Sequence, residues 1–184
     1  MAEARRIDRG RGLQIPDVSD SAYYAFIDLT IVQNRERAMR RMTWAEPRLG
    51  AQRNQPFFFY AYAGDAERVR ALFEAELAQP RDSIEQLAAE PGLHRMRGEL
   101  LLAEGRALEA IPELRASEMA ADGPVNNCVI CLSVAVGRAF DKANMPDSAI
   151  TWYEDYLETP FPNRLSFDLE GNDDNDFVYV PAGD

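Results

Sequence analysis

The chain has 184 residues, of which 46% are hydrophobic and 28% charged, a composition typical of one globular domain and not of a disordered chain. Its formal net charge of -11 argues against a nucleic-acid-binding protein, because such a protein must first neutralise phosphates. A single histidine, His94, excludes any site that needs two, and we expect neither a metal ion nor another cofactor.

The chain begins with a charged segment, MAEARRIDRGRG, that lacks the apolar core of a secretory signal. Its longest apolar stretches, 57–63 and 128–136, are much shorter than the roughly 20 residues that a membrane helix needs. We therefore expect a cytoplasmic protein without a membrane partner. Three parts are predicted: a loose N-terminal arm over 1–18, a helical domain over 19–160 and an irregular acidic tail over 161–184.

Helices are predicted where apolar residues recur at helical spacing between capping or breaking residues. The first helix runs from a cap at Ser19 or Asp20 to about Met42. The others run from Pro56 to a stop at Gly64, from an Asp65 cap to Gln79, from Asp82 or Ser83 to a break at Pro91-Gly92, from Leu93 to Glu104, from Arg106 to Ala121 with a bend at Pro112, from Asn126 or Asn127 to Ala143, and from Ser148 to Leu157.

The apolar stripe of each helix is expected to face the core. Within the aromatic run 57–60, Phe57 and Tyr60 are expected inside. The other side chains predicted to point inward are Tyr23, Phe26, Ile27, Ile31, Ala38, Met42, Val69, Leu72, Phe73, Leu77, Leu93, Met96, Leu100, Leu101, Leu108, Ile111, Leu114, Ile150, Tyr153 and Leu157.

Three predicted helix pairs share one layout, which indicates an internal repeat. Their short turns lie at 63–65, 104–106 and 143–145 and therefore recur at nearly equal intervals. The period of about 40 residues is typical of stacked helical hairpins. Small residues recur 12 positions apart in the second and third pairs, and we expect them to let the two helices approach closely: Gly98 and Ala110, and Gly137 and Ala149.

These residues resemble the tetratricopeptide pattern, in which a first block with a small residue is followed by A-x3-F and then by proline. The resemblance covers residues 55–165, and AGDAERVRALFEAEL, AEGRALEAIPELRASE and PDSAITWYEDYLETPFPNR are similar to the repeats that trail bacterial serine/threonine protein kinases. It implies an all-α fold of stacked antiparallel helix hairpins, a short right-handed solenoid. The implied function is a scaffold that binds a protein or peptide, with no enzymatic activity.

In tetratricopeptide proteins the first helix of each hairpin lines the concave surface, which implies a peptide-binding groove at the matching positions here. Arg95, Arg138 and Lys142 are expected to hold a peptide carboxylate, because charge-assisted hydrogen bonds to arginine are strong. The predicted groove residues are Asn54, Phe58, Tyr62, Arg95, Glu99, Leu102, Arg138, Asp141 and Lys142.

Other roles stay open. The chain can be the C-terminal regulatory or sensor region of a bacterial protein kinase or transcription regulator, or its first helix and aromatic surfaces can form a homodimer. A small helical enzyme using Cys128 or His94 is the alternative from another class. The motif Cys128-Val-Ile-Cys131 lacks the second ligand pair of a zinc site, so we interpret both cysteines as core residues.

Basic residues gather in two places, in the predicted arm at Arg5, Arg6, Arg9 and Arg11 and in the first predicted helix at Arg35, Arg37, Arg40 and Arg41. We interpret them as a loose tail and a solvated helix face. The alternative is a contact surface for an acidic partner.

Overall fold

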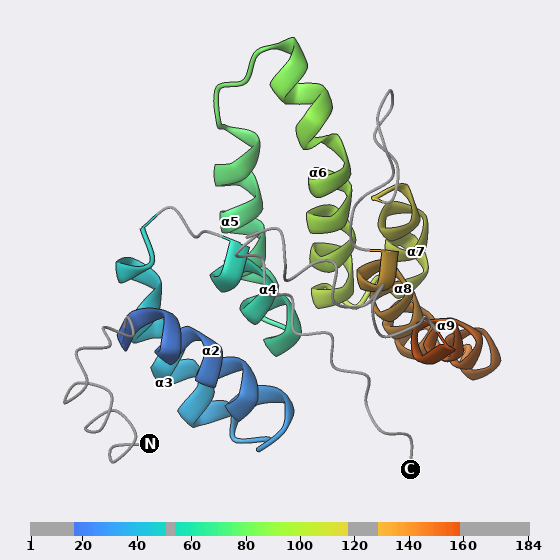
Figure 1. The fold of residues 1–184 in the computed structure, drawn as a ribbon, viewed down its shortest axis with the longest axis horizontal. Coiled ribbons are helices and arrows are strands. Elements are labelled where there is room, and N and C mark those ends of the chain that lie inside the picture. The colour runs from blue at the N-terminus through green and yellow to red at the C-terminus, as the bar shows by residue number, and fades with distance from the viewer. Residues whose placement is uncertain (1–16, 51–53, 118–128, 159–184) are drawn as a thin grey trace. The chain divides into compact units, whose positions relative to one another are not determined.

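A computed structural model describes residues 17–50, 54–117 and 129–158, and all regular elements in these ranges are helices (Figure 1). The chain divides into two compact units, Met1–Phe59 and Tyr60–Asp184, whose boundary falls within helix α4 (Asn54–Ala63). None of the described helices is both long and apolar enough to cross a membrane. The predicted acidic tail and nearly all of the predicted arm lie outside the described residues.

The first unit contains a pair of packed helices, α2 (Asp17–Thr30) and α3 (Arg35–Ala45), where one long helix was predicted. The chain turns at Gln33, which has a left-handed φ of 54°. The side chain of Asn34 then accepts a hydrogen bond from the backbone N–H of Arg37 at 3.0 Å and caps the second helix. The single-helix prediction is therefore wrong, because Asn34 starts a new helix.

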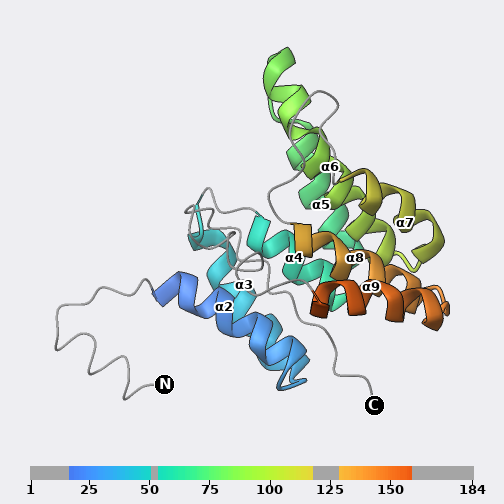
Figure 2. The same cartoon turned by 45° about the vertical axis from the view of Figure 1, so that its right-hand side comes forward.

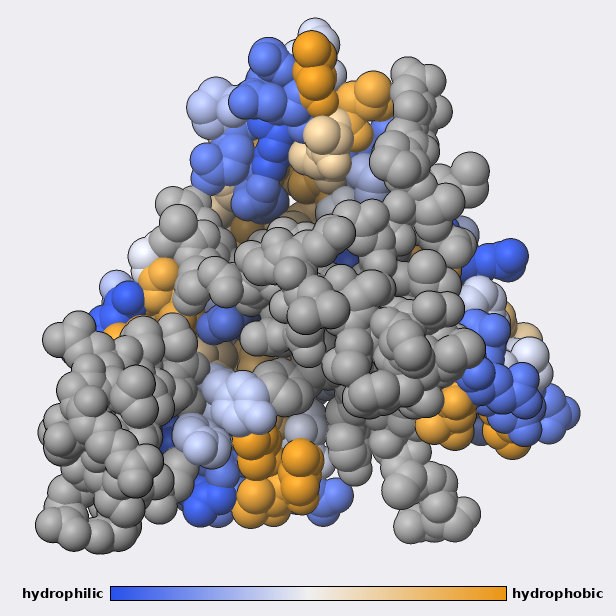
Figure 3. Space-filling view, in the orientation of Figure 1, coloured by the Kyte–Doolittle hydropathy of each residue, from blue (hydrophilic) through white to orange (hydrophobic). Residues whose placement is uncertain are grey.

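Aromatic and small side chains fill the core of the first unit. The rings of Phe26 and Phe59 meet edge to face, with centroids 5.5 Å apart. Ile31 and Val32, in contrast, are exposed in the α2–α3 turn, where Figure 3 shows hydrophobic surface. Ile31 was predicted inside, and it is exposed because the helix ends before it. A short 3-10 helix, η1 (Glu46–Arg48), follows α3.

The second unit continues from α4 through five further helices. In Figure 2 they follow one another from α5 to α9, and α6 packs against α5 and α7 while α8 packs against α7 and α9. Their bounds are α5 (Ala66–Leu77), α6 (Ser83–Ala103), α7 (Ala107–Ala116), α8 (Val129–Lys142) and α9 (Pro146–Glu158).

Helix α6 is continuous through Pro91-Gly92, where a break was predicted. Proline removes one backbone donor from the helix interior, which disfavours but does not prevent continuation. At its start, Asp82 and Glu85 form a capping box that satisfies the first backbone N–H groups. In the second half of α6, the buried face over 93–102 packs into the core. This packing outweighs the tendency of the Pro-Gly pair to break the helix.

The three predicted hairpin turns share one hydrogen-bonding pattern. Gly64, Gly105 and Asn144 have φ values of 70°, 77° and 58°. In each turn, the N–H of this residue donates to the carbonyl three residues back, and the next N–H donates to the carbonyl five residues back. This pair of hydrogen bonds is a Schellman motif, which requires a left-handed residue after the helix. The sequence position of all three turns is therefore confirmed, with asparagine replacing glycine in the third.

Two glycines allow close contact within the hairpins, as the small-residue pattern predicted. A Cβ atom at Gly98 would lie 2.6 Å from the Leu114 side chain, and one at Gly137 would lie 2.7 Å from the Tyr153 ring. Each glycine faces the large residue 16 positions later, not the small one 12 positions later. The sequence offset from Gly98 to Gly137 equals the offset from Leu114 to Tyr153, and we call this common offset the repeat step.

Alanines line the inward faces of α7 and α9, where three large apolar residues were also predicted to lie. Leu108, Ile150 and Leu157 were predicted inside but are 65%, 52% and 56% exposed. Their neighbours Ala107, Ala110 and Ala149 are buried instead, because consecutive helix residues point in directions about 100° apart. Of the other residues predicted inside, Tyr23 and Leu77 are also exposed. The main core cluster consists of Leu101, Leu102, Ala107, Ala110, Leu114, Leu132, Ala135, Val136 and Ala139.

Candidate functional site

Four of the nine predicted groove residues come together in the second unit. Tyr62 comes from α4, Arg95 and Glu99 from α6 and Arg138 from α8, which are the first helices of the three hairpins. Together with Tyr153 of α9, we call these residues the inner cluster.

Glu99 is the centre of the inner cluster and is fully buried. Arg95 Nε donates a hydrogen bond to its Oε1 at 3.3 Å, and Arg138 Nη2 donates to its Oε2. A buried carboxylate needs such partners, since an unpaired buried charge is strongly unfavourable. Two arginines against one glutamate leave these three side chains with one net positive charge.

Arg138 is held from two sides. Its guanidinium carbon lies 3.9 Å from the centroid of the Tyr62 ring, a close cation–π contact. Burial is the largest single influence and lowers the pKa of Arg138, but the charge and hydrogen bond of Glu99, together with Tyr62 and Tyr153, outweigh it, so the pKa is raised and the side chain stays charged. Its buried Nη1 atom has no hydrogen-bond partner among the described residues.

Tyr153 contributes a second donor without an acceptor. Its ring fills the space above Gly137, and its buried hydroxyl has no hydrogen-bond partner within the described ranges. Burial raises the pKa of Tyr153 to about 12, so the hydroxyl keeps its proton at neutral pH. Arg138 and Tyr153 also act on each other's ionisation, which places the two groups near each other. The sequence predicts Tyr153 as a core residue but does not indicate that its hydroxyl lacks a partner among the described residues.

The remaining predicted groove residues are not members of the inner cluster, although the charge of Asp141 acts on the ionisation of Tyr153. Phe58 is half-buried and meets the ring of Phe57, with centroids 5.3 Å apart. Leu102 belongs to the core cluster, so its predicted place on an accessible surface is wrong. Asp141 and Lys142 lie towards the end of α8, where Lys142 is exposed. The side chain of Asn54 lies outside the described residues.

Glu99 changes the interpretation of the predicted carboxylate site. Arg95 and Arg138 both pair with this internal carboxylate, so a peptide carboxylate has to be held by their remaining donors. The spacing of Arg95 and Glu99, four residues on one helix, was a signal for the first pair. The signal for the second pair, Glu99 and Arg138, was that these residues are one repeat step apart. The same step separates Gly105 from Asn144 in the last two turns.

His94, which the sequence left without a carboxylate partner, has one in the structure. Its Nδ1 atom lies 2.7 Å from Oε2 of Glu113 in α7, and Arg97 Nη1 lies 3.2 Å from the same oxygen. Within the described ranges, no group of three histidine, cysteine or acidic side chains is placed to hold a metal ion. Cys128 and the side chain of Cys131 lie outside those ranges, so the thiol hypothesis stays a prediction.

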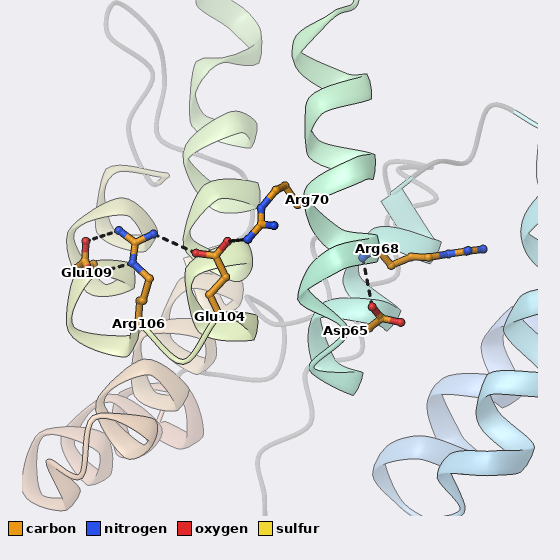
Figure 4. A network of polar contacts seen from close by, with 6 residues as sticks. All are labelled: Asp65, Arg68, Arg70, Glu104, Arg106 and Glu109. Atoms are coloured by element: carbon orange, nitrogen blue, oxygen red, sulfur yellow. Dashed lines mark hydrogen bonds and ion pairs between the residues drawn. The ribbon is translucent and has the colours of Figure 1, made fainter.

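An exposed ion-pair network joins α5 to the turn between α6 and α7 (Figure 4). Glu104 Oε1 accepts from Arg70 at 2.6 Å, and its Oε2 accepts from Arg106 at 3.0 Å. Arg106 also binds both carboxylate oxygens of Glu109. The hydrogen bond from Arg70 is the main reason that the pKa of Glu104 is lowered. The network braces neighbouring helices, although exposed ion pairs stabilise proteins only slightly.

At least three of the four arginines in the basic cluster of α3 form ion pairs within the first unit. Arg37 and Arg41 both pair with the buried carboxylate of Asp28 in α2, and Arg40 pairs with Glu36. These pairs support the interpretation as a solvated helix face, and the contact surface for an acidic partner stays a prediction.

No family model, curated protein or solved structure matches the chain. The function is therefore inferred from two features of the second unit. One is the recurrence of equivalent contacts along the chain, and the other is the chemistry of the inner cluster.

Proposed function

We propose that the chain is a tetratricopeptide-like repeat protein that binds a protein or peptide. The observation that carries this proposal is the repeat step, which relates Gly98 to Gly137 and Leu114 to Tyr153 in equivalent close contacts. The identical turns support the same equivalence. Hairpins that repeat in this way stack into arrays, and such arrays present extended binding surfaces.

The inner cluster is the proposed binding site, because four of its five residues lie on the first helices, which bind peptides in the family that the sequence resembles. The cluster has one net positive charge and two buried donors that lack acceptors in the described residues, Arg138 Nη1 and Tyr153 Oη. An unmet buried donor is unfavourable, so an added acceptor stabilises the complex. A carboxylate of the ligand satisfies both donors and neutralises the charge.

The bound segment is expected to be short. Tyr62 and Arg138 belong to hairpins that are two steps apart, whereas repeats in a regular solenoid contact only their neighbours. We therefore expect their contact to narrow the proposed peptide groove, which is lined by the first helices, at Tyr62 and Arg138. Access to the two donors requires small side-chain movements, since both atoms are buried.

The test uses two pools of random octapeptides, one with a glutamate fixed at the central position and the other with a glutamine there. The full-length protein is expected to retain the glutamate pool about tenfold better, which is the size of one charge-assisted hydrogen bond. Tyr153→Phe keeps the ring against Gly137 and is expected to lose most of this preference. Tyr24→Phe, in the first unit, is the matched control. Retention of neither pool, or equal retention by the wild type and Tyr153→Phe, would contradict the proposed site.

A further inference from the structure

We propose a second interaction surface on α9, which binds an amphipathic helix with basic flanks from a partner protein. This surface consists of Ile150 and Leu157 together with Asp147, Glu154 and Glu158, and we call it the α9 face. It shares no residue with the inner cluster, although Tyr153 lies on the same helix, and it is tested independently of the proposed peptide site.

The repeat indicates that Ile150 occupies a stacking position that has no neighbour among the described residues. Ile150 follows Ile111 by one repeat step, the offset that also relates Leu114 to Tyr153. In α7, Ile111 packs against the core cluster that includes residues of α8, the first helix of the next hairpin. In α9 the equivalent Ile150 is 52% exposed. An array normally ends in a polar surface, so an exposed isoleucine at this position indicates that another element covers it.

Leu157 extends the exposed apolar surface along the helix. It lies seven residues after Ile150, two helical turns further on the same side, and it is also exposed. Apolar side chains at this spacing match the i and i+7 anchors of a second helix lying alongside. The α9 face is thus shaped for a helix and not for an extended strand.

Charge decides which helix fits. Asp147, Glu154 and Glu158 are exposed and lie on one side of the apolar pair at spacings of seven and four residues. Helix α9 contains no lysine or arginine to balance them. A second copy of α9 would place like charges opposite each other, which disfavours a homodimer through this face. A partner helix with lysine or arginine beside its apolar stripe pairs with the acidic row instead.

The experiment uses a synthetic 14-residue helical peptide with leucines at i, i+3 and i+7 and lysines beside them. Two further peptides serve for comparison, one with glutamate in place of lysine and one with the same residues scrambled. The 184-residue chain is expected to bind the lysine peptide at least about tenfold more tightly than either comparison peptide, since charge complementarity and apolar spacing both contribute.

Substitutions then locate the binding. Ile150→Ser with Leu157→Ser is expected to weaken binding of the lysine peptide about tenfold. The control Leu108→Ser replaces an even more exposed leucine of α7 and is expected to leave binding unchanged. Glu154→Lys with Glu158→Lys is expected to reverse the preference toward the glutamate peptide. All of these positions are exposed, so the melting temperatures should stay close to that of the wild type.

Three outcomes would overturn the proposal. The first is equal binding of the lysine and glutamate peptides, and the second is unchanged binding after Ile150→Ser with Leu157→Ser. The third is a dimer in light scattering that this double substitution dissociates, because a second copy would then cover the face. None of these outcomes bears on the retention of octapeptides by the inner cluster, so the two proposals fail separately.

Discussion

Glu99 and Arg138 lie one repeat step apart, at equivalent positions of successive hairpins, and their side chains form a buried ion pair. The pair therefore follows the repeat, since Gly98 and Gly137 immediately before them also occupy equivalent positions. In a stacked array, equivalent positions of neighbouring units lie side by side, and the ion pair marks this alignment of α6 with α8. The same pair orients Arg138 toward Tyr62, so one contact serves both the fold and the proposed site.

Removing Glu99 is expected to destabilise the protein strongly. Glu99→Ala leaves Arg95 and Arg138 without their common carboxylate, and loss of one partner of a buried ion pair costs about 3–5 kcal/mol. Urea unfolding followed by circular dichroism measures the change. The control is Glu74→Ala, an exposed glutamate of α5, which should stay within about 0.5 kcal/mol of the wild type. A small effect of Glu99→Ala would mean that the arginines reach solvent in its absence.

Replacing both Glu99 and Arg138 tests whether the charge or the shape of the pair stabilises the fold. Glu99→Leu with Arg138→Met is expected to lose much less stability than the sum of the two single changes, since a well-packed apolar pair substitutes for a buried ion pair. The same double variant should lose retention of the glutamate octapeptides. An additive loss of stability would contradict the direct coupling of the two side chains.

The close contact at Gly98 predicts opposite effects for two glycine substitutions on α6. Gly98→Ala introduces a Cβ atom 2.6 Å from Leu114, and we expect a loss of about 1–3 kcal/mol from overpacking. Gly92→Ala meets no described atom within 4 Å and is expected to stabilise the helix by about 0.5–1 kcal/mol. Thermal unfolding of both variants gives the comparison. If the two alanines had the same effect, the tight packing of α6 on α7 would be incorrect.

The three equivalent turns predict that glycine improves the third. Asn144 has a left-handed φ of 58°, which glycine adopts with less strain. Asn144→Gly is therefore expected to stabilise the protein by a few tenths of a kcal/mol, whereas Gly105→Ala should destabilise it by about 1–2 kcal/mol. Chemical denaturation measures both. Destabilisation by Asn144→Gly would indicate that the asparagine side chain has another role.

The sequence predicted the turns and the close contacts because both need particular residues at fixed positions. A left-handed residue must follow each first helix, and a small residue must lie where two helices touch, so Gly64, Gly105 and Gly137 are visible without a structure. Cap residues were visible for the same reason. Asp65 accepts from the N–H of Arg68, as expected for a residue before the first turn of a helix.

Errors arose where tertiary packing decides. Leu108, Ile150 and Leu157 were expected to face inward but are exposed, whereas Ala110 and Ala149 are buried at the helix contacts, as their small size indicated. The continuity of α6 through Pro91 depends in the same way on packing of its second half. Glu99 is buried against Arg138, which belongs to another hairpin. The sequence around Glu99 alone does not indicate this burial.

The network around Glu104 predicts a pH dependence with a definite sign. The hydrogen bond from Arg70 lowers the pKa of Glu104 below its ordinary value of 4.5. A carboxylate whose pKa is lowered on folding stabilises the folded state above its unfolded pKa, and this contribution is lost as the pH falls through the folded pKa. Arg70→Gln removes the main cause, so its melting temperature should fall less than that of the wild type between pH 6 and pH 3. Arg115→Gln, an exposed arginine of α7 outside the network, is the control and should follow the wild type. Identical pH profiles for Arg70→Gln and the wild type would show that Glu104 does not depend on Arg70 in solution.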